Sequence, residues 1–264
     1  MDKTLTFIWH DCFVFEDKNC IIVFDFWKDK FLDNNNLPLF LNKQDKTKSI
    51  FVFVSHHHKD HFNRSIFEWE KYFPNIHFII SKDVARHCRY LLRPESIYKS
   101  YKPNPDNVFI VSSGDHITFE NLKVNVFGST DIGNSYVVEI EGIKIFHAGD
   151  LNAWIWKDES TIKEVEVEIK KFRDILEKIK EKFSSFDLVM FPVDPRLGTD
   201  YFEGARIFVN EFHIAHFFPM HFCLWENEEQ KMKFLYSASN FKEYANPDFG
   251  EYIALLSPYS SFGF

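Results

Sequence analysis

Short apolar runs of the kind that form β-strands recur along almost the whole chain. Most are four to eight residues long and rich in Val, Ile and Phe, which is typical of buried strands. The runs are TLTFIW, CFVFE, CIIVFDF, IFVFVS, IHFIIS, NVFIVSS, LKVNVF, SYVVEI, IKIFHA, DLVMFPV and HFFPMHF. Stretches with helical patterns fall between them, so the chain is predicted to mix strands with helices.

Helices are predicted at five places along the chain. They cover residues 62–73, 82–91, 159–183, 201–212 and 226–240. The clearest, 159–183, carries apolar residues from Ile162 to Phe183 at alternating spacings of three and four, with Lys and Glu on its other face. This stripe favours one helix packed on a sheet, although its spacing would also suit a short coiled-coil seam. Residues 28–49 are polar and are predicted to form a long loop.

Size and composition limit the possible classes of protein. A chain of 264 residues, 45% of them apolar, can bury one large core, and no break divides it, so residues 1–264 are interpreted as a single domain. The net charge of -8, with no basic block, argues against a nucleic-acid partner but leaves a small anionic substrate open. No apolar run is long enough to span a membrane, and no signal peptide is evident. Four cysteines without a CxxC pair favour a cytoplasmic protein with reduced thiols.

The most distinctive segment is His56-His57-His58-Lys59-Asp60-His61, which directly follows the run IFVFVS. Side chains alternate along an extended chain, so His56 and His58 are expected on the same side and His57 on the other. Imidazole and carboxylate groups are the donors that Zn, Mn or Fe accept. We therefore predict that His56, His58, Asp60 and His61 bind a divalent metal, at one or two neighbouring positions.

The pattern His56-x-His58-x-Asp60-His61 resembles the metallo-β-lactamase superfamily. Asp25 follows an apolar strand, as the first motif of that superfamily does, and Asp150 and His221 match its bridging carboxylate and its last metal-binding histidine. The resemblance implies an α/β fold, an αββα four-layer sandwich of two mixed β-sheets flanked by helices. It also implies that His56, His58, Asp60, His61, Asp150 and His221 gather at one cleft, with Asp25 orienting ligands instead of binding the metal.

Further motifs look like the ascorbate-6-phosphate lactonase-like branch of that superfamily. They are WHDCFVFE, GIKIFHAGD, PMHF, Ser129-Thr130-Asp131-Ile132-Gly133 and Asp194-Pro195-Arg196-Leu197-Gly198. The branch carries a histidine near the metals at the place of His10, although His10 also fits an ordinary edge-strand histidine. Arg196 suits a carboxylate or phosphate of a substrate, and an ion pair with Asp194 is the alternative.

One departure from the superfamily pattern concerns the third histidine of the first metal position. The stretch VNVFGSTDIGNSY, where that histidine is expected, contains none, so Ser129 or Asp131 is the candidate replacement. With fewer ligands, the position formed by His56 and His58 is predicted to hold metal more weakly than the position formed by Asp60 and His61. His147 is interpreted either as a neighbour of the ligands or as a hydrogen-bonded core histidine.

The function implied is that of a metal-dependent hydrolase. A bound metal, zinc first and Mn or Fe next, lowers the pKa of water, and Asp60, His10 and Arg196 are the candidate catalytic residues. The expected substrate is a small ester, lactone or phosphodiester. The alternatives are a non-catalytic binding protein of the same fold and, with less support, a di-iron redox protein. Cys223 is interpreted as a buried structural thiol, with a place facing the cleft as the alternative. Trp154 and Trp156 fit the wall of a pocket or the core equally well.

Overall fold

The computed structural model describes residues 3–29, 37–42, 44–97, 101–224, 227–241 and 252–264. The chain divides into two compact units. Unit 1 consists of Met1–Val111 with Leu256–Phe264, and unit 2 consists of Ser112–Leu255. Unit 1 is therefore discontinuous in sequence, because the end of the chain returns to it.

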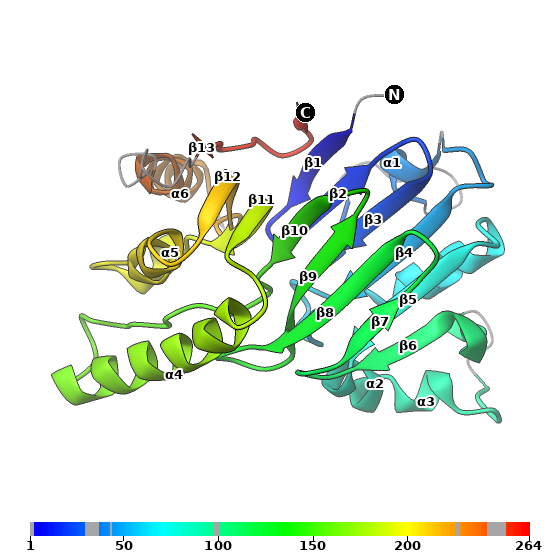
Figure 1. The fold of residues 1–264 in the computed structure, drawn as a ribbon, viewed down its shortest axis with the longest axis horizontal. Helices are drawn as coiled ribbons and strands as arrows, with labels where there is room; N and C mark the ends of the chain where they lie inside the picture. The colour runs from blue at the N-terminus through cyan, green and yellow to red at the C-terminus, as the bar shows by residue number, and fades with distance from the viewer. Residues whose placement is uncertain (1–2, 30–36, 43, 98–100, 225–226, 242–251) are drawn as a thin grey trace. The chain divides into compact units, whose positions relative to one another are not determined.

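Unit 1 is built on a mixed seven-stranded sheet in the order β14-β1-β2-β3-β4-β5-β6 (Figure 1). Its strands are β1 (Thr4–Trp9), β2 (Cys12–Glu16), β3 (Cys20–Phe24), β4 (Ser49–Val54), β5 (Ile76–Ser81), β6 (Val108–Val111) and β14 (Ser261–Gly263). Strands β3 to β6 pair in parallel, whereas β1 is antiparallel to β2 and to β14. Strand β2 is antiparallel to both β1 and β3, so β1, β3, β4 and β5 all run in the same direction.

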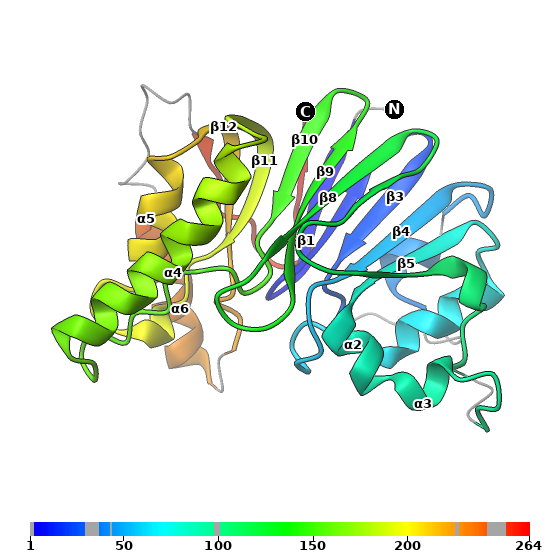
Figure 2. The same ribbon diagram turned by 60° about the horizontal axis from the view of Figure 1, so that its bottom comes forward.

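Five short helices accompany this sheet in the described part of unit 1. They are α1 (Leu39–Asn42), η1 (Arg64–Lys71), α2 (Lys82–His87), α3 (Arg89–Leu92) and η3 (Pro105–Asn107). The predicted helix over 62–73 is present as the 3-10 helix η1, whose start is capped by the Asn63 side chain accepting from the Ser65 amide. The predicted helix over 82–91 is broken at Cys88, which ends α2 and precedes α3 (Figure 2).

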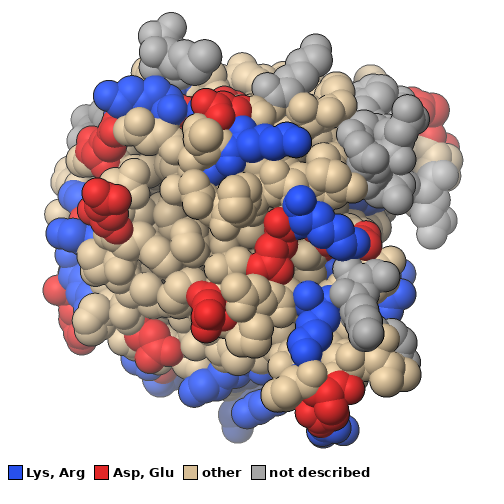
Figure 3. All heavy atoms as spheres, turned by 90° about the vertical axis from the view of Figure 1, so that its right-hand side faces the viewer, with Lys and Arg blue, Asp and Glu red and all other residues tan. Residues whose placement is uncertain are grey.

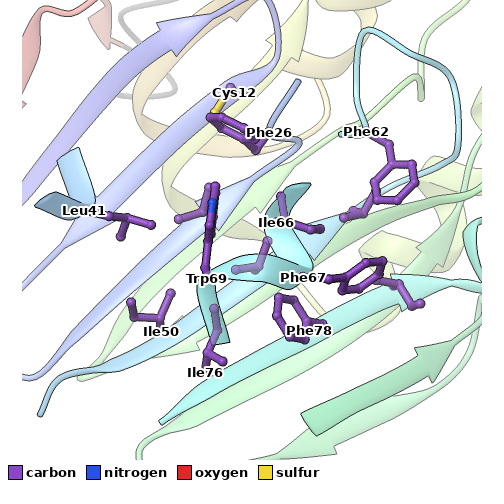
Figure 4. Close-up of a cluster of buried hydrophobic side chains, with 14 of the residues drawn as sticks. Cys12, Phe26, Leu41, Ile50, Phe62, Ile66, Phe67, Trp69, Ile76 and Phe78 are labelled. Carbon is purple, nitrogen blue, oxygen red and sulfur yellow. The ribbon is translucent and has the colours of Figure 1, made fainter. Parts of the chain in front are cut away.

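The core of unit 1 lies between η1 and the sheet. Trp69, Ile66 and Phe67 of η1 are almost fully buried and meet Ile50, Ile76 and Phe78 of the strands (Figure 4). The Trp69 ring also packs edge-on against Phe26, just after β3. This packing fixes the chain on both sides of the histidine-rich segment, which runs from β4 to η1.

Unit 2 contains a second mixed seven-stranded sheet, in the order β13-β12-β11-β10-β9-β8-β7. Its strands are β7 (His116–Thr118), β8 (Leu122–Gly128), β9 (Asn134–Ile140), β10 (Ile143–His147), β11 (Ser185–Pro192), β12 (His213–Met220) and β13 (Tyr252–Ile253). Strands β10 to β13 pair in parallel, and β8, β9 and β10 pair antiparallel. It follows that β8, β10, β11 and β12 share one direction.

The helices of unit 2 are α4 (Ile162–Lys180), η4 (Pro195–Leu197), α5 (Glu203–Val209) and α6 (Glu228–Asn240). A capping box formed by Thr161 and Glu164 starts α4. Phe172, Leu176 and Ile179, in its C-terminal half, are buried, where α4 contacts β8 and α5. That half of the predicted stripe is thus used for packing within unit 2, whereas Ile162 at its start is 81% exposed.

The predicted fold class, α/β with two mixed sheets flanked by helices, is confirmed, and each apolar run contributes to a strand. The short strands β7, β13 and β14 and helix α1 were not predicted; α1 falls inside the predicted loop 28–49, much of which lies outside the described residues. No described helix has the length and apolar character of a membrane span. On the face drawn in Figure 3, acidic and basic side chains are intermixed. The interpretation of residues 1–264 as one domain stays a prediction.

Candidate metal centre

The predicted site residues of unit 1, and Asp11 beside them, all follow strands that run in the same direction. His10 and Asp11 follow β1, Asp25 follows β3, and the segment from Ser55 to His61 follows β4. The carboxyl ends of strands with a common direction lie at one edge of a sheet, which is where ligand sites form in α/β proteins. The topology of the sheet therefore gathers these residues, although up to 51 positions, from His10 to His61, separate them in sequence.

Asp25 is the organising residue of this edge. One oxygen accepts hydrogen bonds from the Ser55 hydroxyl at 2.6 Å and from His61 Nδ1 at 2.9 Å, and the other accepts from the Ser55 amide at 2.7 Å. Asp25 is buried and has a left-handed backbone, with φ 44°. Its carboxylate therefore fixes the orientation of the His61 ring and leaves Nε2 as the atom of His61 that could bind a metal.

The Ser55 hydroxyl extends the same arrangement to His56. Because that hydroxyl donates to Asp25, it accepts from His56 Nδ1, at 2.9 Å. His56 Nε2 then lies 3.0 Å from His58 Nδ1. Two nitrogens bound at roughly 2.0–2.1 Å to one tetrahedral ion lie roughly 3.3 Å apart, so this spacing fits two ligands of the same metal.

His10 and Asp11, in the turn between β1 and β2, are both fully buried. His10 Nε2 lies 3.2 Å from an oxygen of Asp11 and 3.7 Å from an oxygen of Asp60. The same Asp11 oxygen lies 3.5 Å from His61 Nε2. His10 is thus enclosed beside two carboxylates.

His57 points away from this cluster, as its position in the strand predicted. Its amide and its Nδ1 both donate to Asp83, at 2.9 and 3.0 Å, and its ring stacks on His87. Burial alone would raise the pKa of Asp83, but hydrogen bonds from Ser81 and His57 outweigh it and hold that pKa below its ordinary value. A cavity of about 520 Å³ adjoins these residues and is lined by His58, Lys59, Arg64, Trp27 and Phe62, among others.

Unit 2 repeats the strand-end arrangement. Asp150 follows β10, Asp194 follows β11 and His221 follows β12. His221 Nδ1 donates to Asp194 at 3.0 Å, and His221 Nε2 lies 3.2 Å from an oxygen of Asp150. Asp194 therefore orients His221 as Asp25 orients His61, and His221, with φ 66°, also has a left-handed backbone.

Arg196 forms the ion pair with Asp194 that was the alternative to substrate binding. Its Nε and Nη2 atoms contact the Asp194 carboxylate at 3.0 and 2.6 Å, and Nη2 lies 3.2 Å from His221 Nδ1. Burial alone would raise the pKa of Asp194, but His221 and Arg196 outweigh it and hold that pKa well below its usual range. Asp194 is thus a stable carboxylate.

Several other residues of unit 2 that the sequence motifs single out lie near the turn that carries Asp150. Trp154 donates from its indole nitrogen to the Asp150 carbonyl at 2.9 Å, and its ring lies edge-on to His221. The Thr130 hydroxyl of the STDIG stretch accepts from the Asn152 amide at 3.0 Å. His147 is fully buried and accepts from the Gly149 amide, which fits the core alternative, and Cys223 is a buried thiol.

In each unit the donors are of the kinds that fit a divalent metal. His56, His61 and His221 each have Nδ1 held by a hydroxyl or a carboxylate, which leaves Nε2 with a lone pair for a metal. Buried carboxylates accompany them in both units. The sequence patterns indicate the ligand candidates, whereas Asp11 and Ser55, each adjacent to a residue of those patterns, come to light only from the contacts.

Comparison with known proteins identifies the family of the chain. The model of the beta-lactamase superfamily domain matches residues 4–169. A curated protein of Pyrococcus furiosus named as a UPF0173 metal-dependent hydrolase is 25% identical over 232 residues, 84% of this chain and 85% of its own.

Two solved structures have a similar fold. Igni18, described as a novel metallo hydrolase from Ignicoccus hospitalis, has a TM-score of 0.64 at 14% identity and covers 100% of this chain and 99% of its own. CmlA, a diiron beta-hydroxylase from Streptomyces venezuelae, has a TM-score of 0.65 at 10% identity and covers 100% of this chain but 54% of its own. At these identities the likeness concerns the fold alone.

Proposed function

Because this chain belongs to the metallo-β-lactamase superfamily and is a metal-dependent hydrolase, we propose that it hydrolyses a small ester, lactone or phosphodiester. The observation that carries the proposal is the set of histidines whose Nδ1 atoms are held by Asp25, Ser55 and Asp194. Such fixed imidazoles are typical of metal ligands. The lactonase-like branch, suggested by the STDIG and DPRLG stretches, supplies the lactone as the first substrate to test.

We further propose that the ligands of the two units serve one metal centre within a single domain. His56 and His58 hold one position, Asp60, His61 and His221 hold the other, and Asp150 is shared. The support is the order of the motifs in the sequence and the strand-end placement of each ligand within its own unit. Zinc is the first candidate because imidazole predominates among the donors, with Mn and Fe next. When bound, the metal supplies a Lewis acid and a water of lowered pKa.

The residues around this centre have separate tasks in the proposal. Asp60 holds the proton of the attacking water, and His10, 3.7 Å from an Asp60 oxygen, positions that carboxylate or takes the proton onward. Arg196 holds Asp194, and we retain a contact with an anionic group of the substrate as its second proposed task. The four cysteines, all buried free thiols, support a reducing compartment such as the cytoplasm.

The cavity beside His58 supports a small substrate with an anionic group. Lys59 and Arg64 bring positive charge to its lining, and Trp27 and Phe62 bring apolar rings. Its volume of about 520 Å³ falls within the range of roughly 300–1,000 Å³ that small-molecule sites occupy. A phosphorylated or carboxylated lactone has both the charge and the apolar ring faces that this lining accommodates.

The proposal is tested by turnover with lactones, esters and phosphodiesters on protein loaded with Zn, Mn or Fe. We expect at least one metal-dependent activity, and we expect Asp60→Ala and Asp150→Ala each to reduce it by about 100-fold or more, as loss of a proton-transfer or metal-holding group does. Lys123→Ala, a change in a different, surface-exposed part of unit 2, is the matched control and should retain activity. Activity unchanged in both aspartate variants would reveal a contaminating enzyme.

The alternatives make different predictions in the same assay. A non-catalytic binding protein binds the metal but turns over none of the substrates. A di-iron redox protein retains iron in preference to zinc and consumes oxygen in the presence of a reductant. Metal analysis of protein purified without a tag or chelator, combined with the turnover panel, separates the three functions.

A further inference from the structure

We propose that Asp11 is an additional metal ligand, at the position held by His61. This inference rests on the proposed metal centre and extends it with a residue that the superfamily motifs do not include. Asp11 is fully buried, and one of its oxygens lies 3.5 Å from His61 Nε2 and 3.2 Å from His10 Nε2.

The turn between β1 and β2 is shaped to bring Asp11 inward. His10 has a left-handed backbone, with φ 58°, a conformation that residues other than glycine rarely adopt. The β1–β2 pairing also shifts register between Phe7 and Trp9, just before this turn. Non-glycine residues persist in such conformations only where the surroundings enforce them, which frequently marks a functional site.

The hydrogen bonds of His61 indicate that a cation lies between its ring and the Asp11 carboxylate. His61 Nδ1 donates a hydrogen bond to Asp25, which also accepts hydrogen bonds from the amide and the hydroxyl of Ser55. In neutral His61, Nε2 therefore offers a lone pair, and it faces a carboxylate oxygen at 3.5 Å. Two acceptors at this spacing repel each other unless a positive charge lies between them, and a buried carboxylate is costly unless such a charge compensates it. A metal ion ligated by both atoms meets this requirement.

With Asp11 as a ligand, the difference in metal affinity between the two positions would increase. The His61 position gains a third carboxylate besides Asp60 and the shared Asp150, whereas the His56 and His58 position gains none. Carboxylate oxygens suit Mn better than imidazole nitrogens do. We therefore expect the His61 position to bind its ion more tightly and to accept Mn more readily than the superfamily motifs alone would indicate.

The experiment is a double-mutant cycle on metal affinity, measured on chelator-stripped protein by competition with a chromophoric chelator for Zn and Mn. The variants are Asp11→Asn, His61→Ala and the pair together. We expect Asp11→Asn to lower the metal affinity of the tighter site about 10-fold or more. The double variant should lose less affinity than the product of the two single-variant losses. Equal affinities for Asp11→Asn and the native protein, or losses that multiply independently, would overturn the inference.

Asp83→Asn is the matched control, because Asp83 is also a carboxylate in contact with a histidine but lies outside the proposed ligand set. It should leave both metal affinities unchanged. If the native protein binds no metal, the proposed function itself fails, whereas a native protein that binds metal with Asp11→Asn unaltered refutes only the role of Asp11.

A crystal structure of the metal-loaded native protein provides a test that needs no variant. We expect an Asp11 oxygen about 2.0–2.2 Å from the ion bound by His61. An ion at His61 with both Asp11 oxygens more than about 3 Å away would show that Asp11 pairs with a proton on a histidine instead.

Discussion

At the scale of single residues, Asp25 is hydrogen-bonded, directly or through Ser55, to ligand candidates of both predicted metal positions. It holds His61 directly and His56 through the Ser55 hydroxyl. Asp25→Asn should therefore weaken metal binding at both positions, by roughly 10–100-fold each. Ser55→Ala keeps the contact with His61 and should weaken mainly the position that uses His56. Titration of chelator-stripped protein measures both affinities, and equal effects of the two variants at the His61 position would contradict the argument.

Arg196 offers a separate test of how a ligand is held. Its Nε and Nη2 atoms donate hydrogen bonds to the Asp194 carboxylate, which also accepts a hydrogen bond from His221. Lysine cannot reproduce that planar, two-point contact. We expect Arg196→Lys to lower metal affinity at the position that uses His221 by several-fold to about 10-fold. A rise in KM with unchanged metal affinity would instead support the contact of Arg196 with an anionic group of the substrate.

The sequence predicted the ligand candidates better than their supporting contacts. The spacing of His56, His58, Asp60 and His61 is local, so one segment of sequence reveals it. The pairs Asp25 with His61 and Asp194 with His221 join residues 36 and 27 positions apart, and only the parallel pairing of strands brings them together. Asp11 had a visible signal, a carboxylate beside His10, but the left-handed turn that directs it inward could not be inferred from composition.

Helix α4 allows a prediction at the scale of one element. The apolar stripe along this helix is continuous in sequence, but Leu176 is buried whereas Ile162 is 81% exposed. Leu176→Ala should lower the free energy of unfolding by about 2–5 kcal/mol, because it removes packed methyl groups and leaves a cavity. Ile162→Ala, a similar deletion at an exposed position of the same stripe, should change it by less than about 0.5 kcal/mol. Denaturant unfolding provides both values, and similar losses would mean that the whole stripe is covered in solution.

The other elements show where sequence patterns lose precision. Alternating and continuous runs of Val, Ile and Phe predicted the longer strands, because the burial of a strand in a sheet is visible in the apolar residues of that run alone. The break at Cys88 was missed, since the helical pattern of 82–91 continues through it while the backbone turns at φ -95° and ψ 12°. Strands β7, β13 and β14 have only two or three residues each, too few for a pattern to be recognised.

The whole molecule should unfold in one step if residues 1–264 form a single domain. Calorimetry is expected to give one transition, with equal calorimetric and van't Hoff enthalpies, whose midpoint rises with added zinc because the metal binds only the folded state. The discontinuity of unit 1 is the structural reason, since its sheet includes β14 from the far end of the chain. Two resolved transitions, with only one sensitive to zinc, would show that the units fold independently.

The return of the chain to β1 has a consequence for biosynthesis. A ribosome makes the histidine-rich segment long before β14, which covers the outer edge of β1. Until β14 has emerged, β1 presents unpaired backbone groups to other nascent chains, a template for unwanted pairing. Loss of β14 would leave every candidate ligand in place and still leave an open sheet edge, so the intact metal-binding residues would not protect the polypeptide from aggregation.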